Sequence, residues 1–391
     1  IDILSERALL LDQMGRYREA LEVCERVTAL ARTAYGVDHP DYPAVLFMHS
    51  DALRSAGRYD EAQQLLEEVR DWYRKHEGER SQMYGYLLRR LAQAAHDRNR
   101  FQESDRSMDA ALQVLQATEG DTGAGVVVGW KLWADMCAER GEFERAEQNY
   151  QKALHLSADN PRLTFFRTGA STGLALMLAD LSRWDEAVQQ QRTAIAALQR
   201  LSGMRIAQAD SLRVLAGIYA SAGRIADAEK THRESLALCE ASVGREHPRY
   251  AVAETSYARF LAEVGRYTEA DSLTRHALEI EARTHGTAHR EYAGALACAA
   301  GISLDTGRSE EAVQLLTQAL DIQRASVGER NQQIATIQHN LGCAYLDLHQ
   351  FRQATEHLNA ATELVAELNG KSHPRYGISL TALGRTQQEQ G

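Results

Sequence analysis

The residues best placed for acid–base chemistry are the aspartates of two Asp-Thr-Gly triplets, at 121–123 and 305–307. Two carboxylates can share one proton and divide the roles of acid and base, but they must face each other across a dyad of β-lobes. Asp305 falls in a turn between two predicted helices, and Asp121 falls in a loop several helix pairs away. The triplets therefore predict no catalytic pair.

Phosphate, metal and thiol chemistry are equally poorly supported. The glycine-rich segment at 123–129 follows no strand and lacks the Gly-Lys-Ser/Thr ending that phosphate loops use. His285 and His289 offer two imidazoles in a loop, with no third metal ligand evident nearby. The five cysteines form no Cys-x-x-Cys pair, which fits small core residues in a reducing compartment. We therefore expect no catalytic residue, no metal ligand and no cofactor, and interpret the chain as a non-enzyme.

The element that organises the chain is a tight turn, best seen in Gly265-Arg266-Tyr267-Thr268-Glu269-Ala270. It recurs at 15–20 and 57–62, and weaker copies begin at residues 99, 141, 182, 223, 307 and 349. Successive copies are 41 or 42 residues apart. A fixed period of this size indicates a stacked-repeat array.

Small residues recur in phase with this turn, five places after its first residue and seven places before that residue. Ala270 and Ala258 illustrate the two series around Gly265. Two antiparallel helices can approach closely only where side chains are small, so the series mark where the two helices of each pair touch. The pattern predicts an all-α fold, a right-handed α-solenoid of about nine and a half helix-turn-helix repeats.

We expect a single superhelix over 1–391, because each repeat of a solenoid packs on the next. The predicted repeats are 1–42, 43–84, 85–126, 127–167, 168–208, 209–250, 251–292, 293–334 and 335–376, followed by a half-repeat at 377–391. The chain starts with Ile1, and its first helix carries several leucines where a polar cap would be expected. This predicts a segment of a longer protein.

The segment Trp130-x2-Trp133-Ala134, followed by Gly141, Phe143, Ala146 and Ala153, resembles the tetratricopeptide repeat family. The resemblance extends over the whole chain. The usual period of that family is shorter, and the extra residues here lie in connections such as Gly-x-x-His-Pro at 244–248. Lengthened repeats with this connection are similar to those of the kinesin light chain type.

The resemblance implies that the first helix of each pair lines a concave groove. The residues expected on this partner-binding face are Phe47, Arg54, Tyr86, Arg89, Arg90, Lys131, Arg213, Arg259 and Asn340. Arginines beside aromatic rings suit an extended acidic peptide with an apolar anchor. Alternatively, Asp51, Asp97, Asp135 and Glu139 neutralise the same cations and leave a solvated, salt-bridged face.

Composition limits the class of partner. The net charge of −10 argues against a nucleic-acid array, and no apolar run approaches the roughly 20 residues that span a bilayer. We therefore expect a cytoplasmic scaffold that binds a protein or peptide, with no nucleic acid and no membrane as partner; self-association of arrays stays open. The alternative implied by the resemblance is a regulatory array of a larger signalling enzyme, such as a bacterial Ser/Thr kinase or a nucleotide-switch ATPase.

Overall fold

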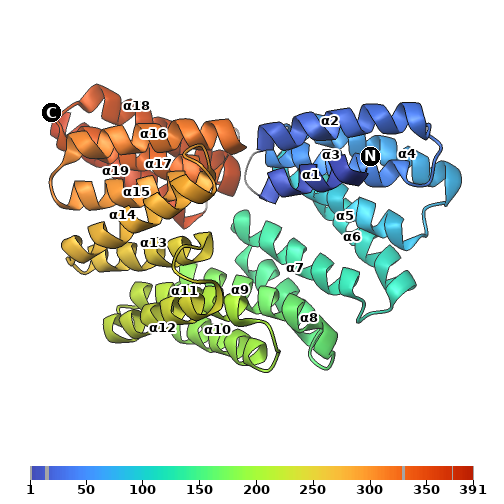
Figure 1. Ribbon diagram of the computed structural model, residues 1–391, viewed down its shortest axis with the longest axis horizontal. Coiled ribbons are helices and arrows are strands. Elements are labelled where there is room, and N and C mark those ends of the chain that lie inside the picture. The colour runs from blue at the N-terminus through green and yellow to red at the C-terminus, as the bar shows by residue number, and fades with distance from the viewer. Residues whose placement is uncertain (1, 14–16, 328–330, 372, 391) are drawn as a thin grey trace. The chain divides into compact units, whose positions relative to one another are not determined.

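The computed structural model describes residues 2–13, 17–327, 331–371 and 373–390. Over these residues the chain is helical, with short connections and no strand, as the turn pattern predicts (Figure 1). No helix of this part of the chain is long and apolar enough to cross a membrane.

The helices follow one another in antiparallel pairs. Their bounds are α1 Asp2–Gln13, α2 Tyr17–Ala34, α3 Tyr42–Ser55, α4 Tyr59–His76, α5 Gln82–Asp97, α6 Phe101–Glu119, α7 Ala124–Glu139, α8 Phe143–Leu156, α9 Thr164–Asp180, α10 Trp184–Gln199, α11 Arg205–Ser221, α12 Ile225–Val243, α13 Pro248–Glu263, α14 Tyr267–Thr284, α15 Arg290–Asp305, α16 Ser309–Val327, α17 Gln332–Asp347, α18 Phe351–Asn369 and α19 Pro374–Gln390, with a 3-10 helix, η1, at Pro161–Leu163.

The repeated turn ends the first helix of a pair in a left-handed residue. Gly265 has φ 80°, and its N–H donates to the Ala262 carbonyl at 2.9 Å, while Arg266 N–H reaches back to the Leu261 carbonyl at 2.8 Å. These bonds satisfy carbonyls that the helix end would otherwise leave unpaired. Glycine adopts this conformation without steric cost, which explains why it dominates the turn.

Small residues bring the two helices of a pair together, as predicted. A Cβ added to Gly342 on α17 would lie 2.4 Å from Leu358 Cγ on α18, closer than real Cβ atoms come to other heavy atoms. At the same register Ala258 and Ala300 are fully buried.

The long connections between pairs have a capping role. His247 Nδ1 accepts a hydrogen bond from Arg249 N–H at 3.1 Å, and Pro248 occupies the first turn of α13. Asn331 caps α17 in the same way, with Gln333 N–H donating to its Oδ1 at 2.7 Å. A side-chain acceptor followed by proline is a favourable start for a helix, so the residues beyond the usual period serve to begin the next repeat.

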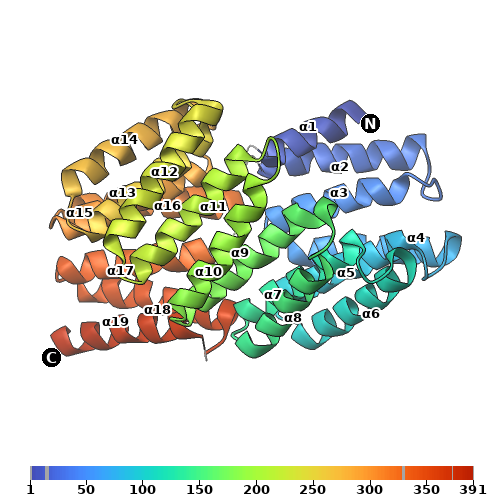
Figure 2. The ribbon, with the colours of Figure 1, turned by 90° about the horizontal axis from the view of Figure 1, so that it is seen from below.

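The chain divides into two compact units, and the single superhelix over 1–391 stays a prediction. Unit 1 comprises 1–136 with 324–330, and unit 2 comprises 137–323 with 331–391. Within unit 2 the last pairs return to the first. Asn369 Nδ2 donates to the Glu139 carbonyl at 3.2 Å, and the rings of Phe143 and His373 lie 5.8 Å apart, beside the start of α19 (Figure 2).

Candidate functional site

In unit 1 the structure brings the predicted residues of α3 and α5 together, but most of their charges are already paired. Arg54 Nε donates to Asp97 Oδ2 at 2.7 Å, and Arg90 pairs with Asp51. Both ion pairs join α3 to α5. On α7, Lys131 Nζ lies 2.5 Å from Asp135 Oδ2. Asp51 and Asp97 therefore join α3 to α5, and the three ion pairs leave few of these cations available to a partner.

The aromatic residues of this cluster are also occupied. Phe47 is buried, and the Arg90 guanidinium covers its ring at 4.9 Å. Tyr86 donates its hydroxyl to Glu119 at 2.6 Å and lies under Arg89 at 5.2 Å. Arg89 Nε is buried without a hydrogen-bond partner among the residues that the structure describes, and burial lowers the pKa of the Arg89 guanidinium.

In unit 2 the predicted residues Arg213 of α11 and Arg259 of α13 line one cavity of ≈ 500 Å³, here called the α9–α13 cavity. Neither guanidinium forms a hydrogen bond or an ion pair with any described residue, and Arg213 Nε is buried. Asp180 and Glu263 also line the cavity without pairing with these arginines. Two arginines without an ion pair to a described residue thus line one cavity.

Burial and neighbouring charges shift the pKa values of the groups around this cavity. Burial lowers the pKa of Arg213, the nearby Asp210 carboxylate raises it, and the charge of Arg259 lowers it. His232 of α12, which is 2% exposed, has a pKa lowered to about 4 by burial and then by the charges of Arg259 and Arg213. The imidazole is therefore neutral near pH 7 and adds no charge.

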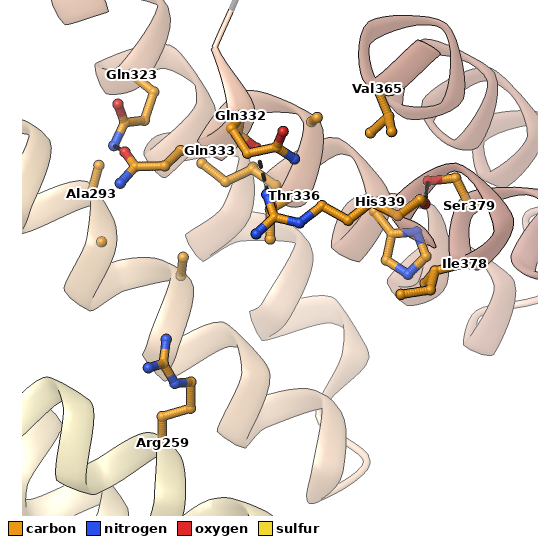
Figure 3. A pocket seen from close by; sticks show the side chains of 15 residues that line it. Arg259, Ala293, Gln323, Gln332, Gln333, Thr336, His339, Val365, Ile378 and Ser379 are labelled. Atoms are coloured by element: carbon orange, nitrogen blue, oxygen red, sulfur yellow. Dashed lines mark hydrogen bonds between the residues drawn. The ribbon is translucent and has the colours of Figure 1, made fainter. Parts of the chain in front are cut away.

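A second cavity of ≈ 500 Å³ continues from Arg259 along the next odd-numbered helices, and we call it the α15–α19 cavity. Figure 3 shows His339, Val365, Ile378 and Ser379 grouped at one end, with Gln323 and Gln333 at the other. Its walls combine aliphatic side chains with amides, and Arg375 of α19 also lines it.

Asn340 lies half-buried on α17 but does not line this cavity, whereas its neighbour His339 does. Sequence reasoning missed Arg375 and Gln323 as lining residues. Arg375 is in register with Gln333 one repeat earlier, so extending the repeat register into the last helix would have found it. Gln323 belongs to α16, a second helix of its pair, and no groove register identifies it.

The histidine pair does have a carboxylate neighbour, contrary to expectation. Glu281, four residues before His285 on α14, accepts a hydrogen bond from His285 Nδ1 at 2.7 Å, and ligand atoms of these two residues and His289 lie within 4.8 Å. His289 Nδ1, however, caps α15 by accepting Glu291 N–H at 3.1 Å, and the two imidazole rings stack at 4.3 Å. Two stacked imidazole rings do not direct their nitrogen lone pairs at one metal position. The arrangement of His289 therefore serves to cap α15.

The fold is shared with solved helical-repeat proteins. Aspartyl phosphate phosphatase F from Bacillus subtilis is 11% identical, with a TM-score of 0.56, over 96% of this chain and 94% of that one. A Rap protein complexed with Competence and Sporulation Factor is 13% identical, with a TM-score of 0.50, over 89% and 98%. A putative kinesin light chain from Podosopora anserina with nearly identical TPR-like repeats is 24% identical over 54% and 98%, with a TM-score of 0.39.

The comparison with curated proteins found no match. A family model described as tetratricopeptide repeat matches residues 1–75, 167–241, 205–283, 292–367 and 333–391, which together make up most of the chain. The matched segments follow the same repeated turns and helix pairs that the structure shows. The chain belongs to the tetratricopeptide repeat family.

Proposed function

We propose that the protein is a binding scaffold whose odd-numbered helices in unit 2 hold an extended, acidic segment of a partner protein. The observation that carries this proposal is the pair Arg213 and Arg259, which face one cavity without a carboxylate partner among the described residues. Guanidinium groups bind carboxylates in a forked geometry, and a ligand that supplies carboxylates would satisfy both.

The arrangement favours unit 2 over the cluster in unit 1. There, a partner would have to displace Asp97 from Arg54 and Asp51 from Arg90, which costs the ion pairs already present. In unit 2 neither Arg213 nor Arg259 has an ion pair with a described residue that a ligand would have to break. The Rap protein named above was solved in complex with Competence and Sporulation Factor, which supports a binding role for a chain with this fold.

The test is selection of binders from a random peptide library, followed by fluorescence anisotropy with one selected peptide. We expect enrichment of Asp and Glu, and affinity that falls as salt is raised, because paired charges are screened. Arg213→Gln and Arg259→Gln should each weaken binding roughly 10-fold or more, since a hydrogen bond to a charged group contributes about 1.5–3 kcal/mol.

The matched control is Arg275→Gln, which removes the same charge from the exposed surface of α14, where Arg275 pairs with Asp271 at 2.6 Å. It should leave peptide affinity unchanged. Circular dichroism would confirm that all variants keep their helicity. Equal affinity of the wild type and both cavity variants, or equal loss in Arg275→Gln, would contradict the proposal.

A further inference from the structure

The α15–α19 cavity differs chemically from the rest of the groove, because none of the described residues that line it is an Asp or a Glu. Two of its lining residues are cations, Arg259 and Arg375. Neither side chain forms a hydrogen bond or ion pair with a described residue. In a chain with a net charge of −10, a cavity lined by two arginines that form no ion pair with a described residue, and by no carboxylate of the described residues, is suited to an anion.

The same cavity has a substantial apolar wall. Ala293, Ile337 and Val365 are at most 4% exposed and line it, while Ile378 on α19 is 60% exposed at its edge. A cavity of ≈ 500 Å³ lies in the range of small-molecule sites, which combine apolar walls with a few convergent polar groups. The wall therefore favours a ligand with an aliphatic body and excludes a bare inorganic ion as the best occupant.

A third observation points to a ligand independently of charge. Gln323 is 1% exposed, and its Nε2 donates to the Arg290 carbonyl at 3.2 Å and to Gln333 Oε1 at 2.8 Å. Its Oε1 is buried without a hydrogen-bond partner among the described residues, as is Nδ1 of His339. Unpaired buried polar atoms are costly, and a ligand group that donates a hydrogen bond would remove that cost.

From these observations we propose that the α15–α19 cavity binds a small organic anion, a carboxylate or phosphate ester carried on an aliphatic body. Arg259 and Arg375 hold the anionic group, Ile337, Val365 and Ile378 contact the aliphatic body, and Gln323 Oε1 accepts a hydrogen bond from a ligand hydroxyl or amide. This site does not rest on peptide binding in the α9–α13 cavity, although the two cavities share Arg259.

The experiment is a ligand-observed NMR saturation-transfer titration of the full chain with three probes that each contain six carbons in a straight chain: hexanoate, hexyl phosphate and the uncharged hexanamide. We expect saturable binding of at least one anion, with hexanamide at least roughly 10-fold weaker, because charge-assisted hydrogen bonds are the stronger ones. The better of the two anions identifies the headgroup. Replacing the tighter-binding anion by its short analogue, acetate for hexanoate or phosphate for hexyl phosphate, should lower the affinity, since each buried methylene contributes about 0.8 kcal/mol.

Two variants locate the site. Arg375→Gln should weaken the anion roughly 10–100-fold and leave hexanamide unaffected, because it removes charge at an exposed position of α19. Ala297→Phe fills the cavity and should abolish binding of all probes. The control is Ala196→Phe, which fills a different cavity of ≈ 290 Å³ between α10, α11 and α12.

Several outcomes would overturn the assignment. The first is that neither anion binds saturably to the wild type, and the second is that hexanamide binds as tightly as the anions. The third is that Arg375→Gln binds the anion as tightly as the wild type does. The fourth is that Ala196→Phe loses as much affinity as Ala297→Phe does. Because Arg213 does not line this cavity, Arg213→Gln separates the two proposals: it should weaken the acidic peptide and leave the small anion unchanged.

Discussion

Arginines on the odd-numbered helices have two distinct environments. Arg54 in unit 1 is paired with Asp97, and its charge helps to join α3 to α5. Arg213 in unit 2 is half-buried and has no ion pair with any described residue, and burial lowers the pKa of its guanidinium. A paired arginine mainly serves the fold, whereas a desolvated, unpaired one retains unused hydrogen-bonding capacity that a ligand can satisfy.

The buried imidazole beside these cations makes stability depend on pH. The His232 ring stacks on Tyr257 and lies tilted against Phe260, with a centroid distance of 5.3 Å in each case, and burial lowers its folded pKa to about 4. An unfolded histidine titrates near pH 6.5, so between these values the unfolded chain binds more protons than the folded one. The free energy of unfolding should therefore fall as pH is lowered from about 6.5 to 4, by at most about 1.4 kcal/mol per pH unit from this residue.

Urea unfolding at several pH values would measure this dependence in the wild type and in His232→Gln. The variant should have a shallower slope across that window. His155→Gln, which alters an exposed histidine of α8, should keep the wild-type slope. Parallel slopes for wild type and His232→Gln would show that this imidazole is protonated as readily in the folded chain as in the unfolded one.

At the scale of the helix pair, the spacing of small residues should translate directly into stability. Gly342 and Gly384 occupy the same register in α17 and α19, but only Gly342 faces a neighbouring helix. A Cβ added to Gly342 would lie 2.4 Å from Leu358 Cγ and 3.2 Å from the carbonyl oxygen of Ala354. Gly342→Ala should therefore destabilise by about 1–3 kcal/mol through overpacking. Gly384→Ala meets nothing within 4 Å and should stabilise its helix by about 0.5–1 kcal/mol.

Chemical denaturation of the two variants measures this difference, and each serves as the other's control because the substitution is identical. Changes of the same sign and size at both positions would mean that the small-residue series reflects helix propensity alone. Opposite signs are expected if the series marks where two helices touch.

The sequence predicts the helix pairs well because the same local constraint, a left-handed turn residue with small contacts on either side, is repeated in every pair. The candidate site is less predictable. Whether Arg90 forms an ion pair depends on how close Asp51 of the preceding repeat lies in space, and the sequence spacing of the two residues does not determine that distance. Gln323 lines a cavity from a second helix, so its role depends on how α16 sits against α15 and α17.

At the scale of unit 2, contacts between its ends add a constraint that nearest-neighbour stacking does not provide. Asn369 lies 230 residues from Glu139, whose carbonyl accepts its side-chain N–H. Repeats of a solenoid ordinarily contact only their neighbours, so their stabilities add in one dimension. A contact between distant pairs couples opening at one end of unit 2 to opening at the other.

Asn369→Ala tests this coupling, because it removes the hydrogen bond to the Glu139 carbonyl and should cost about 1 kcal/mol. Amide hydrogen exchange should then rise both in the α18–α19 connection and at the α7–α8 turn. Glu363→Ala, on the exposed side of α18, is the matched control and should change neither segment. Faster exchange confined to the α18–α19 connection would mean that the contact stabilises its own pair alone and that unit 2 opens from either end independently.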